Sequence, residues 1–526
     1  MKRLLYLSLA AVVAACTPQN PLIPRPMDNV DQQSLSHGMI VLGERLNDPY
    51  TVQNMTKALQ SLYPTKAGTS QVPTTDYYVR FLPQSDAQYS MLESLGVELI
   101  DHPLDYRIVR EGDYYQDPSL PEDSITWQYA VVDADFDFPP AIKYEILDKC
   151  YIAEHDRSAT KAYGGVDWEA VEKEAYRLTG NEGMLPEGTK ADYPSTSPSG
   201  RITIVDDMLG GDPIGVSGVR VSCNTFVKTA SAFTDKDGNY RIDRSFTTDV
   251  RYRLVFKNTK GFCIGFNLLL APASNSTLGK NSPEGVSVVI DKTSDRKLFT
   301  RCVVNNAAYD YWQKCEQDGF RINTPPGNLR IWLFQNLKAS SCIMMQQGAI
   351  IDGSIVEQFL GEYTSLLKMF LPDITMGLKG AESYSQVYTS ATHELAHASH
   401  FMQAGKSFWN TYASFILTSY VTSAGTVYGV GTETNHGYCE VGEMWAYYVQ
   451  TKLYRERYNN SSASFGGSYW FSPQILLSLD DRGLDRFKIF KAFEPDVTDK
   501  DKLQDRLISL YPESKSLINQ AFGRYN

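Results

Sequence analysis

The sequence predicts a multidomain α+β protein with a small N-terminal α+β domain, a β-sandwich in the middle and a mostly helical C-terminal domain. Three observations support this fold class. At 526 residues the chain is too long for one ordinary hydrophobic core. Hydrophobic residues at 42% and charged residues at 21% are typical of a folded protein. The hydrophobic pattern also changes along the chain, to short strands after Arg201 and to helical spacing in the last part.

The overall charge narrows the possible partners. The formal net charge is -11 at pH 7, and no basic segment stands out in the sequence. Proteins that bind nucleic acid through its phosphates usually present a basic surface. We therefore expect no nucleic-acid partner.

The N-terminus reads as an export signal. A Lys-Arg pair precedes an apolar run from Leu4 to Ala15, which is too short to cross a bilayer. The stretch "VAAC" that ends at Cys16 resembles the lipobox of bacterial lipoproteins. This resemblance implies removal of residues 1–15, acylation of Cys16 and a location in the bacterial cell envelope, with Thr17 favouring the outer membrane. An ordinary cleaved signal next to a cysteine is the alternative.

After a polar, proline-rich tether at 16–35, the region 36–180 shows mixed strand and helix patterns. Alternation from Tyr78 to Leu82 predicts a strand, followed by a helix with Ser85 as its N-cap. The segment 167–180 predicts another helix, because it begins with Asp and ends with Gly. Residues 181–198 are rich in Pro, Gly, Ser and Thr and predict a linker.

The region 199–290 contains short strand patterns separated by turn residues, which predict a β-sandwich. The segment "TDKDGNYRI" could suggest a calcium loop, but Phe246 would then occupy the position that needs a bidentate Glu, so a turn is preferred. Together with "GRITIVDDMLGGDPIGVSGVRVSC", this segment resembles the carboxypeptidase regulatory-like, transthyretin-type sandwich. The resemblance implies an accessory module that serves in spacing or docking.

The region 300–526 is mostly helical by its apolar spacing. Helical patterns occur at 354–371, 389–405, 440–458 and 501–522. The stretch from Leu329 to Leu337 predicts a strand. Seven cysteines besides Cys16 show no C-x-x-C spacing, and an odd number predicts at least one free thiol.

The segment "HELAH" contains the candidate metal ligands and the candidate general base. His393 and His397 are one helical turn apart, so both imidazoles can reach one Zn²⁺ ion, and Glu394 lies beside the first of them as a candidate general base. An apolar stripe supports the helix, and Gly405 is its expected end. The stripe consists of Val387, Ala391, Leu395, Ala398 and Met402. Two packed or solvated histidines are the alternative interpretation.

A third ligand is needed for a catalytic zinc site. His400 lies about 10.5 Å along the helix axis from His393, too far to converge easily, so packing or a contact behind the ligands is preferred for it over a role as a ligand. Glu440 and Glu443 share the polar face of a second predicted helix, and either could supply the ligand. The apolar face of this predicted helix consists of Val441, Met444, Trp445, Tyr448 and Val449.

The stretch "GEMWAYYV" resembles the second zinc helix of the gluzincin metallopeptidases, and the resemblance implies that Glu443 is the third ligand. It further implies a zincin-like domain that hydrolyses peptides or proteins with Zn²⁺ as cofactor, with Glu394 activating water. Candidates for the donor to the oxyanion remain open and are His436, Tyr438, Tyr428 and Tyr447.

Two further hypotheses concern the same scaffold. The chain could be a non-catalytic surface binding or adhesion lipoprotein built on a metallopeptidase fold. Alternatively, residues 36–140 could be a prodomain that blocks the site, since they precede a candidate protease.

Overall fold

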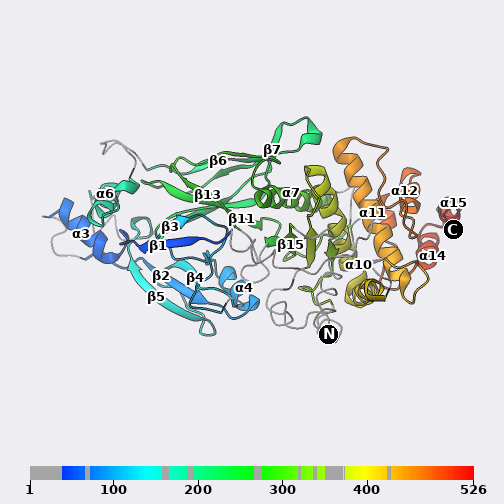
Figure 1. The fold of residues 1–526 in the computed structure, drawn as a ribbon, viewed down its shortest axis with the longest axis horizontal. Helices are drawn as coiled ribbons and strands as arrows, with labels where there is room; N and C mark the ends of the chain where they lie inside the picture. The colour runs from blue at the N-terminus through cyan, green and yellow to red at the C-terminus, as the bar shows by residue number, and fades with distance from the viewer. Residues whose placement is uncertain are drawn as a thin grey trace.

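The computed structural model combines β-sheets with α-helices, and its C-terminal part is mostly helical (Figure 1). The expected signal, Cys16 and the tether lie outside the described residues, as do residues 186–194 of the linker and residues 354–370 of the helix expected at 354–371. The structure describes residues 38–64, 71–121, 124–156, 165–185, 195–265, 275–317, 322–335, 340–349, 371, 373–422 and 428–525.

The N-terminal region contains two antiparallel sheets and flanking helices. A three-stranded sheet has the order β4-β2-β5, and β1 pairs with β3. The expected caps are confirmed, because Ser85 accepts a hydrogen bond from the Gln88 N–H and Asp167 caps the helix that follows it. The elements are β1 (Val41–Arg45), α3 (Val52–Leu62), β2 (Asp76–Leu82), α4 (Asp86–Ser94), β3 (Tyr106–Arg110), β4 (Gln128–Asp133), β5 (Lys143–Cys150), η1 (Ala153–His155), α6 (Trp168–Leu178) and η2 (Glu182–Met184).

Short strands follow, as the sequence predicts for this part of the chain. Asp235 closes a tight turn by accepting hydrogen bonds from the backbone N–H groups of Asp237 and Asn239, which agrees with the turn interpretation. The elements are β6 (Ser199–Val205), η3 (Asp207–Leu209), β7 (Pro213–Gly215), β8 (Val219–Thr225), β9 (Lys228–Phe233), β10 (Asn239–Arg241), β11 (Val250–Asn258), β12 (Cys263–Gly265), β13 (Asn275–Asn281) and β14 (Val288–Ile290).

The largest sheet runs on into the C-terminal part of the chain. β12 pairs in parallel with β15 (Arg330–Phe334), which confirms the strand expected at 329–337. β15 in turn pairs with β17 (Ile374–Gly377), and β16 (Ser341–Cys342) forms the edge. The parallel step from β12 to β15 needs a crossover, and helix α7 (Arg296–Glu316) lies within it.

One hydrophobic core spans this sheet and the helices. It includes residues from Ile202 to Phe522, so the segments 199–290 and 300–526 share a core instead of each enclosing its own. In Figure 1 α7 lies between the strands and α10. The C-terminal elements are α10 (Tyr384–Thr422), α11 (His436–Tyr458), α12 (Gln474–Asp481), α13 (Arg486–Phe490), α14 (Lys500–Leu510), η5 (Pro512–Ser514) and α15 (Lys515–Gly523).

Ion pairs join the N-terminal region to the rest of the chain, and they all have the same orientation of charge. Among the described residues, every ion pair between region 36–180 and later segments places the acid in the N-terminal region. The pairs are Asp86–Arg330, Glu93–Lys257, Glu111–Arg251, Asp113–Arg301, Glu154–Arg244, Glu154–Lys228 and Glu172–Lys228. The contact between the two parts is therefore strongly complementary in charge.

Helix α10 bends sharply at Gly405, whose φ of 77° and ψ of 175° are not helical. The expected helix end is thus a break, and a second helical segment follows it directly. The prediction that Met402 belongs to the buried apolar stripe was wrong. This residue is 47% exposed, because the stripe reaches the surface before the break.

The cysteines beyond the N-terminus form no disulfides. All seven are free thiols, in line with the expectation from their odd number. Within the described ranges we find no helix with both the length and the apolar character needed to cross a bilayer.

Candidate metal centre

Two crossing helices, α10 and α11, position the site. The Trp445 indole donates a hydrogen bond of 3.1 Å to the Ala396 carbonyl, which fixes the first half of α10 against α11. Gly442 faces the Tyr412 ring, where an added Cβ would lie 3.2 Å away, so the second half of α10 also packs closely. The amphipathic pattern expected for α11 was wrong, because α11 is buried on every side from Cys439 to Thr451. The helix lies between α10 and the C-terminal helices and presents no solvent face over this stretch.

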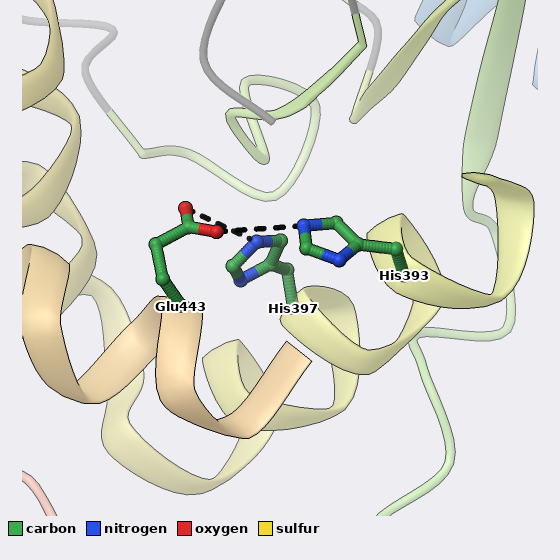
Figure 2. A group of neighbouring side chains, drawn as sticks. All are labelled: His393, His397 and Glu443. Atoms are coloured by element: carbon green, nitrogen blue, oxygen red, sulfur yellow. Dashed lines mark ion pairs between the residues drawn. The ribbon is translucent and has the colours of Figure 1, made fainter. Parts of the chain in front are cut away.

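The structure brings His393, His397 and Glu443 together (Figure 2). The Nε2 atom of His393 lies 3.5 Å from Oε2 of Glu443, and Nε2 of His397 lies 3.5 Å from Oε1. One ligand atom from each residue lies within 4.8 Å of the others. A tetrahedral zinc with bonds of about 2.0–2.1 Å separates its ligand atoms by about 3.3–3.4 Å. The spacing therefore fits a zinc ion with only small adjustments.

The chemistry of these atoms also fits a metal. The three residues are at most 1% exposed, and Nε2 of His393 makes no hydrogen bond to any part of the chain that the structure describes. Burial lowers the pKa of His397 and favours its neutral form. Burial opposes ionisation of Glu443, but its interactions with the neighbouring imidazoles, that of His397 above all, lower its pKa to about 2. Neutral imidazoles and an ionised carboxylate are the forms that bind zinc.

Three further side chains hold the ligands, and sequence reasoning missed the role of each. Gln450 accepts a hydrogen bond of 2.9 Å from Nδ1 of His393, and Tyr412 donates one of 2.6 Å to Oε1 of Glu443. The ring of Tyr447 packs edge-on against His393 with centroids 4.5 Å apart. The sequence does contain one signal for Gln450. It lies seven residues after Glu443, about two turns along α11, so both residues are on the same face of the helix.

Glu394 is completely buried next to His393 on α10. Burial raises the pKa of the Cys342 thiol, and the charges of Glu394, Asp373 and Glu443 raise it further. The carboxylates of Glu394 and Glu443 thus act on the same neighbour in β16.

Two other candidates from the sequence lie away from the cluster. His400 is buried among Phe408, Trp409 and Phe493, and burial lowers its pKa to about 3, which supports the packing interpretation. Glu440 accepts a hydrogen bond of 2.9 Å from the Lys500 backbone N–H, so it caps α14 instead of joining the histidines.

The candidates for an oxyanion donor fall into two groups. Tyr447 lies beside His393, and the hydroxyl of Tyr428 lies 3.4 Å from that of Tyr447. Tyr438 packs on Phe408, on the side of His400, and His436 donates from Nδ1 to the Glu433 carbonyl. The first group is therefore closer to the ligands.

Tyr469 is an additional candidate that the sequence did not reveal. Its ring packs on Tyr447 and Tyr428 with centroids 5.6 and 5.1 Å away. Burial raises the pKa of Tyr469, a hydrogen bond with Tyr447 opposes this shift, and the charge of Glu443 adds to it. Unlike Tyr428 and Tyr447, Tyr469 is only partly buried. Tyr469 is thus the least buried residue of this tyrosine cluster.

A second group with metal-ligand side chains consists of Asp76, Asp133 and His155. Nδ1 of His155 is bonded to Asp76, and Nε2 contacts the guanidinium of Arg244. Both ring nitrogens are therefore engaged, and a cation already lies beside the group.

Comparison of the chain with protein families, with characterised proteins and with solved structures finds no match.

Proposed function

We propose that this protein is a zinc metallopeptidase, in which His393, His397 and Glu443 hold Zn²⁺ and Glu394 acts as the general base. The observation that carries this proposal is the convergence of three buried ligand atoms from two helices at zinc spacing. Two imidazoles and one carboxylate are the ligand set of hydrolytic zinc sites that keep a position for water. The substrate class is a peptide or a protein.

The layout of the chain forms part of the same proposal. Residues 300–526 form the zincin-like part, and residues 199–290 form an accessory sandwich that shares its core and its largest sheet. Residues 36–180 form an N-terminal α+β domain. An acylated Cys16 anchors the protein to the cell envelope, in the outer membrane. The resemblance of the N-terminal stretch to a lipobox supports the anchor.

The chain's own residues then have distinct roles. Zinc would supply a Lewis acid that polarises the scissile carbonyl and acidifies water. Glu394 takes the proton from the attacking water and passes it to the leaving amine. Tyr469 donates a hydrogen bond to the oxyanion, since its ring packs in the tyrosine cluster beside His393 and it is the least buried residue of the three.

One observation favours a second candidate, a non-catalytic binding lipoprotein on the same scaffold. The side chains of the cluster and Glu394 are almost completely buried, whereas a peptidase must admit a substrate to them. In that case the metal, if bound, stabilises the fold.

The test combines metal content with turnover. Elemental analysis of the chain from residue 17 onward should give about one zinc per molecule. Cleavage of a mixed peptide library should be abolished by a chelator and by Glu394→Gln, with zinc retained in the variant. Zinc binding with no cleavage of any peptide would favour the binding protein, and full cleavage by Glu394→Gln would refute the proposed base.

A further inference from the structure

One edge of α11 holds His393 from three directions. Nε2 faces the carboxylate of Glu443, the ring meets Tyr447, and Nδ1 bonds to Gln450. These three residues of α11 are spaced four and three positions apart, so they lie along one face of the helix. The side chain of Gln450 is only 3% exposed, and its position is fixed by the same helix that carries the third ligand.

The hydrogen bond to Gln450 decides which nitrogen of His393 can bind a metal. An amide oxygen can only accept, so Nδ1 of His393 carries the proton and Nε2 keeps its lone pair for the ion. Figure 2 shows Nε2 directed at Glu443, on the side where the other ligands lie. Gln450 thus orients the ring and selects its tautomer.

Gln450 is also uncharged, and this has a chemical consequence. A carboxylate on the outer nitrogen would make the imidazole a stronger donor to the metal. The partner of Glu443 is neutral as well, because Tyr412 donates through its phenol. With two neutral imidazoles and one carboxylate, a bound Zn²⁺ ion keeps a formal charge of about +1.

We infer that Gln450 is a positioning residue that orients His393 for zinc while keeping it a moderate donor, so that the site retains positive charge at the expense of zinc affinity. This inference rests on the proposed zinc site. The buried amide of Gln450 would thus set the balance between the affinity of the site for zinc and the ability of the bound ion to polarise a substrate.

The test measures zinc affinity by competition with a chromophoric chelator, in the full chain and three variants. Gln450→Glu keeps the shape and adds charge, and it should bind zinc about tenfold more tightly. Gln450→Leu removes the acceptor and should bind zinc at least about tenfold more weakly. Gln403→Glu is the matched control, since it makes the same chemical change on α10 at a residue whose amide bonds to Asn323, and it should match the wild type.

Opposite changes in zinc affinity in Gln450→Glu and Gln450→Leu separate this role from a purely structural one. A purely structural role would weaken zinc binding in both variants. Should Gln450→Leu fail to fold, the direction of the shift in Gln450→Glu still decides. One zinc in the wild type with unchanged or lower affinity in Gln450→Glu would overturn the inference alone. A wild type that binds no zinc would overturn both the inference and the proposed site.

Discussion

Tyr412 donates a hydrogen bond of 2.6 Å to Glu443 from the far side of the break in α10. The break at Gly405 turns the second helical segment back, so that Trp409 and Tyr412 both pack near His397. The segment that follows the histidine helix therefore supports the ligand that comes from α11. Glycine suits this position because the positive φ of 77° is strained for other residues.

Glu443 and Glu440 should differ sharply when each is replaced by Ala. Glu443→Ala removes a ligand atom and should abolish stoichiometric zinc binding, measured by elemental analysis after dialysis. Glu440→Ala removes the acceptor for the Lys500 N–H and an ion pair with the Lys500 ammonium, and it should retain about one zinc per chain. Zinc retained in the first variant and lost in the second would reverse the assignment of the third ligand.

Replacing Tyr469 by Phe should reduce the turnover number about 10²–10³-fold, because one donor to the oxyanion is lost. Zinc content and the KM should change little. Tyr438→Phe is the control, since Tyr438 packs on Phe408 and not on the tyrosine cluster. Equal turnover for the two variants would remove Tyr469 from the reaction.

His102 should make the protein less stable in mild acid. Burial and the nearby charge of Arg253 lower the pKa of His102 from 6.5 to about 3. Below pH 6.5 the unfolded chain therefore binds a proton that the folded state does not, and stability falls until the pH approaches 3. At pH 5 the loss is about 2 kcal/mol.

The variant His102→Gln tests this effect, because an amide can still accept from Arg253 without titrating. Urea unfolding at pH 7.5 and at pH 5 should show a smaller loss of stability for the variant than for the wild type. Parallel pH dependence in the two proteins would contradict the prediction.

Asp113→Ala should destabilise the fold by about 2–3 kcal/mol, because Arg301 is 2% exposed and would lose its carboxylate partner. Arg301 keeps its bonds to the Asn275 carbonyl and to Ser276, which limits the cost. Glu111→Ala breaks a neighbouring but more exposed pair with Arg251 and should cost less than about 1 kcal/mol. Chemical denaturation of both variants gives the comparison, and equal losses would show that burial of Arg301 is unimportant.

Local patterns predicted much of what forms locally. The spacing of His393 and His397, the cap at Ser85 and the strand around Trp332 depend on neighbouring residues, and the sequence indicated all of them. The choice of Glu443 over Glu440 came only from a resemblance, since spacing along one helix leaves both on the same side.

Contacts between distant segments were not predictable in the same way. Gln450, Tyr412 and Tyr469 carry no motif, and their relation to the ligands depends on how α10 bends and how the loop after α11 returns. The sheet that crosses from β12 to β15 was missed because a strand of three residues carries too little periodicity. Burial of α11 on all sides was missed because its polar residues are used in internal hydrogen bonds.

The one-sided ion pairs of the N-terminal region have a consequence for synthesis. Domains near the N-terminus are made first and tend to fold first. Until the later segments are synthesised, this region carries several carboxylates without their basic partners. Arg330 is the last of these partners to be made. Mutual repulsion between nascent copies would then hinder their association. Arrival of the basic partners both completes the fold and removes that repulsion.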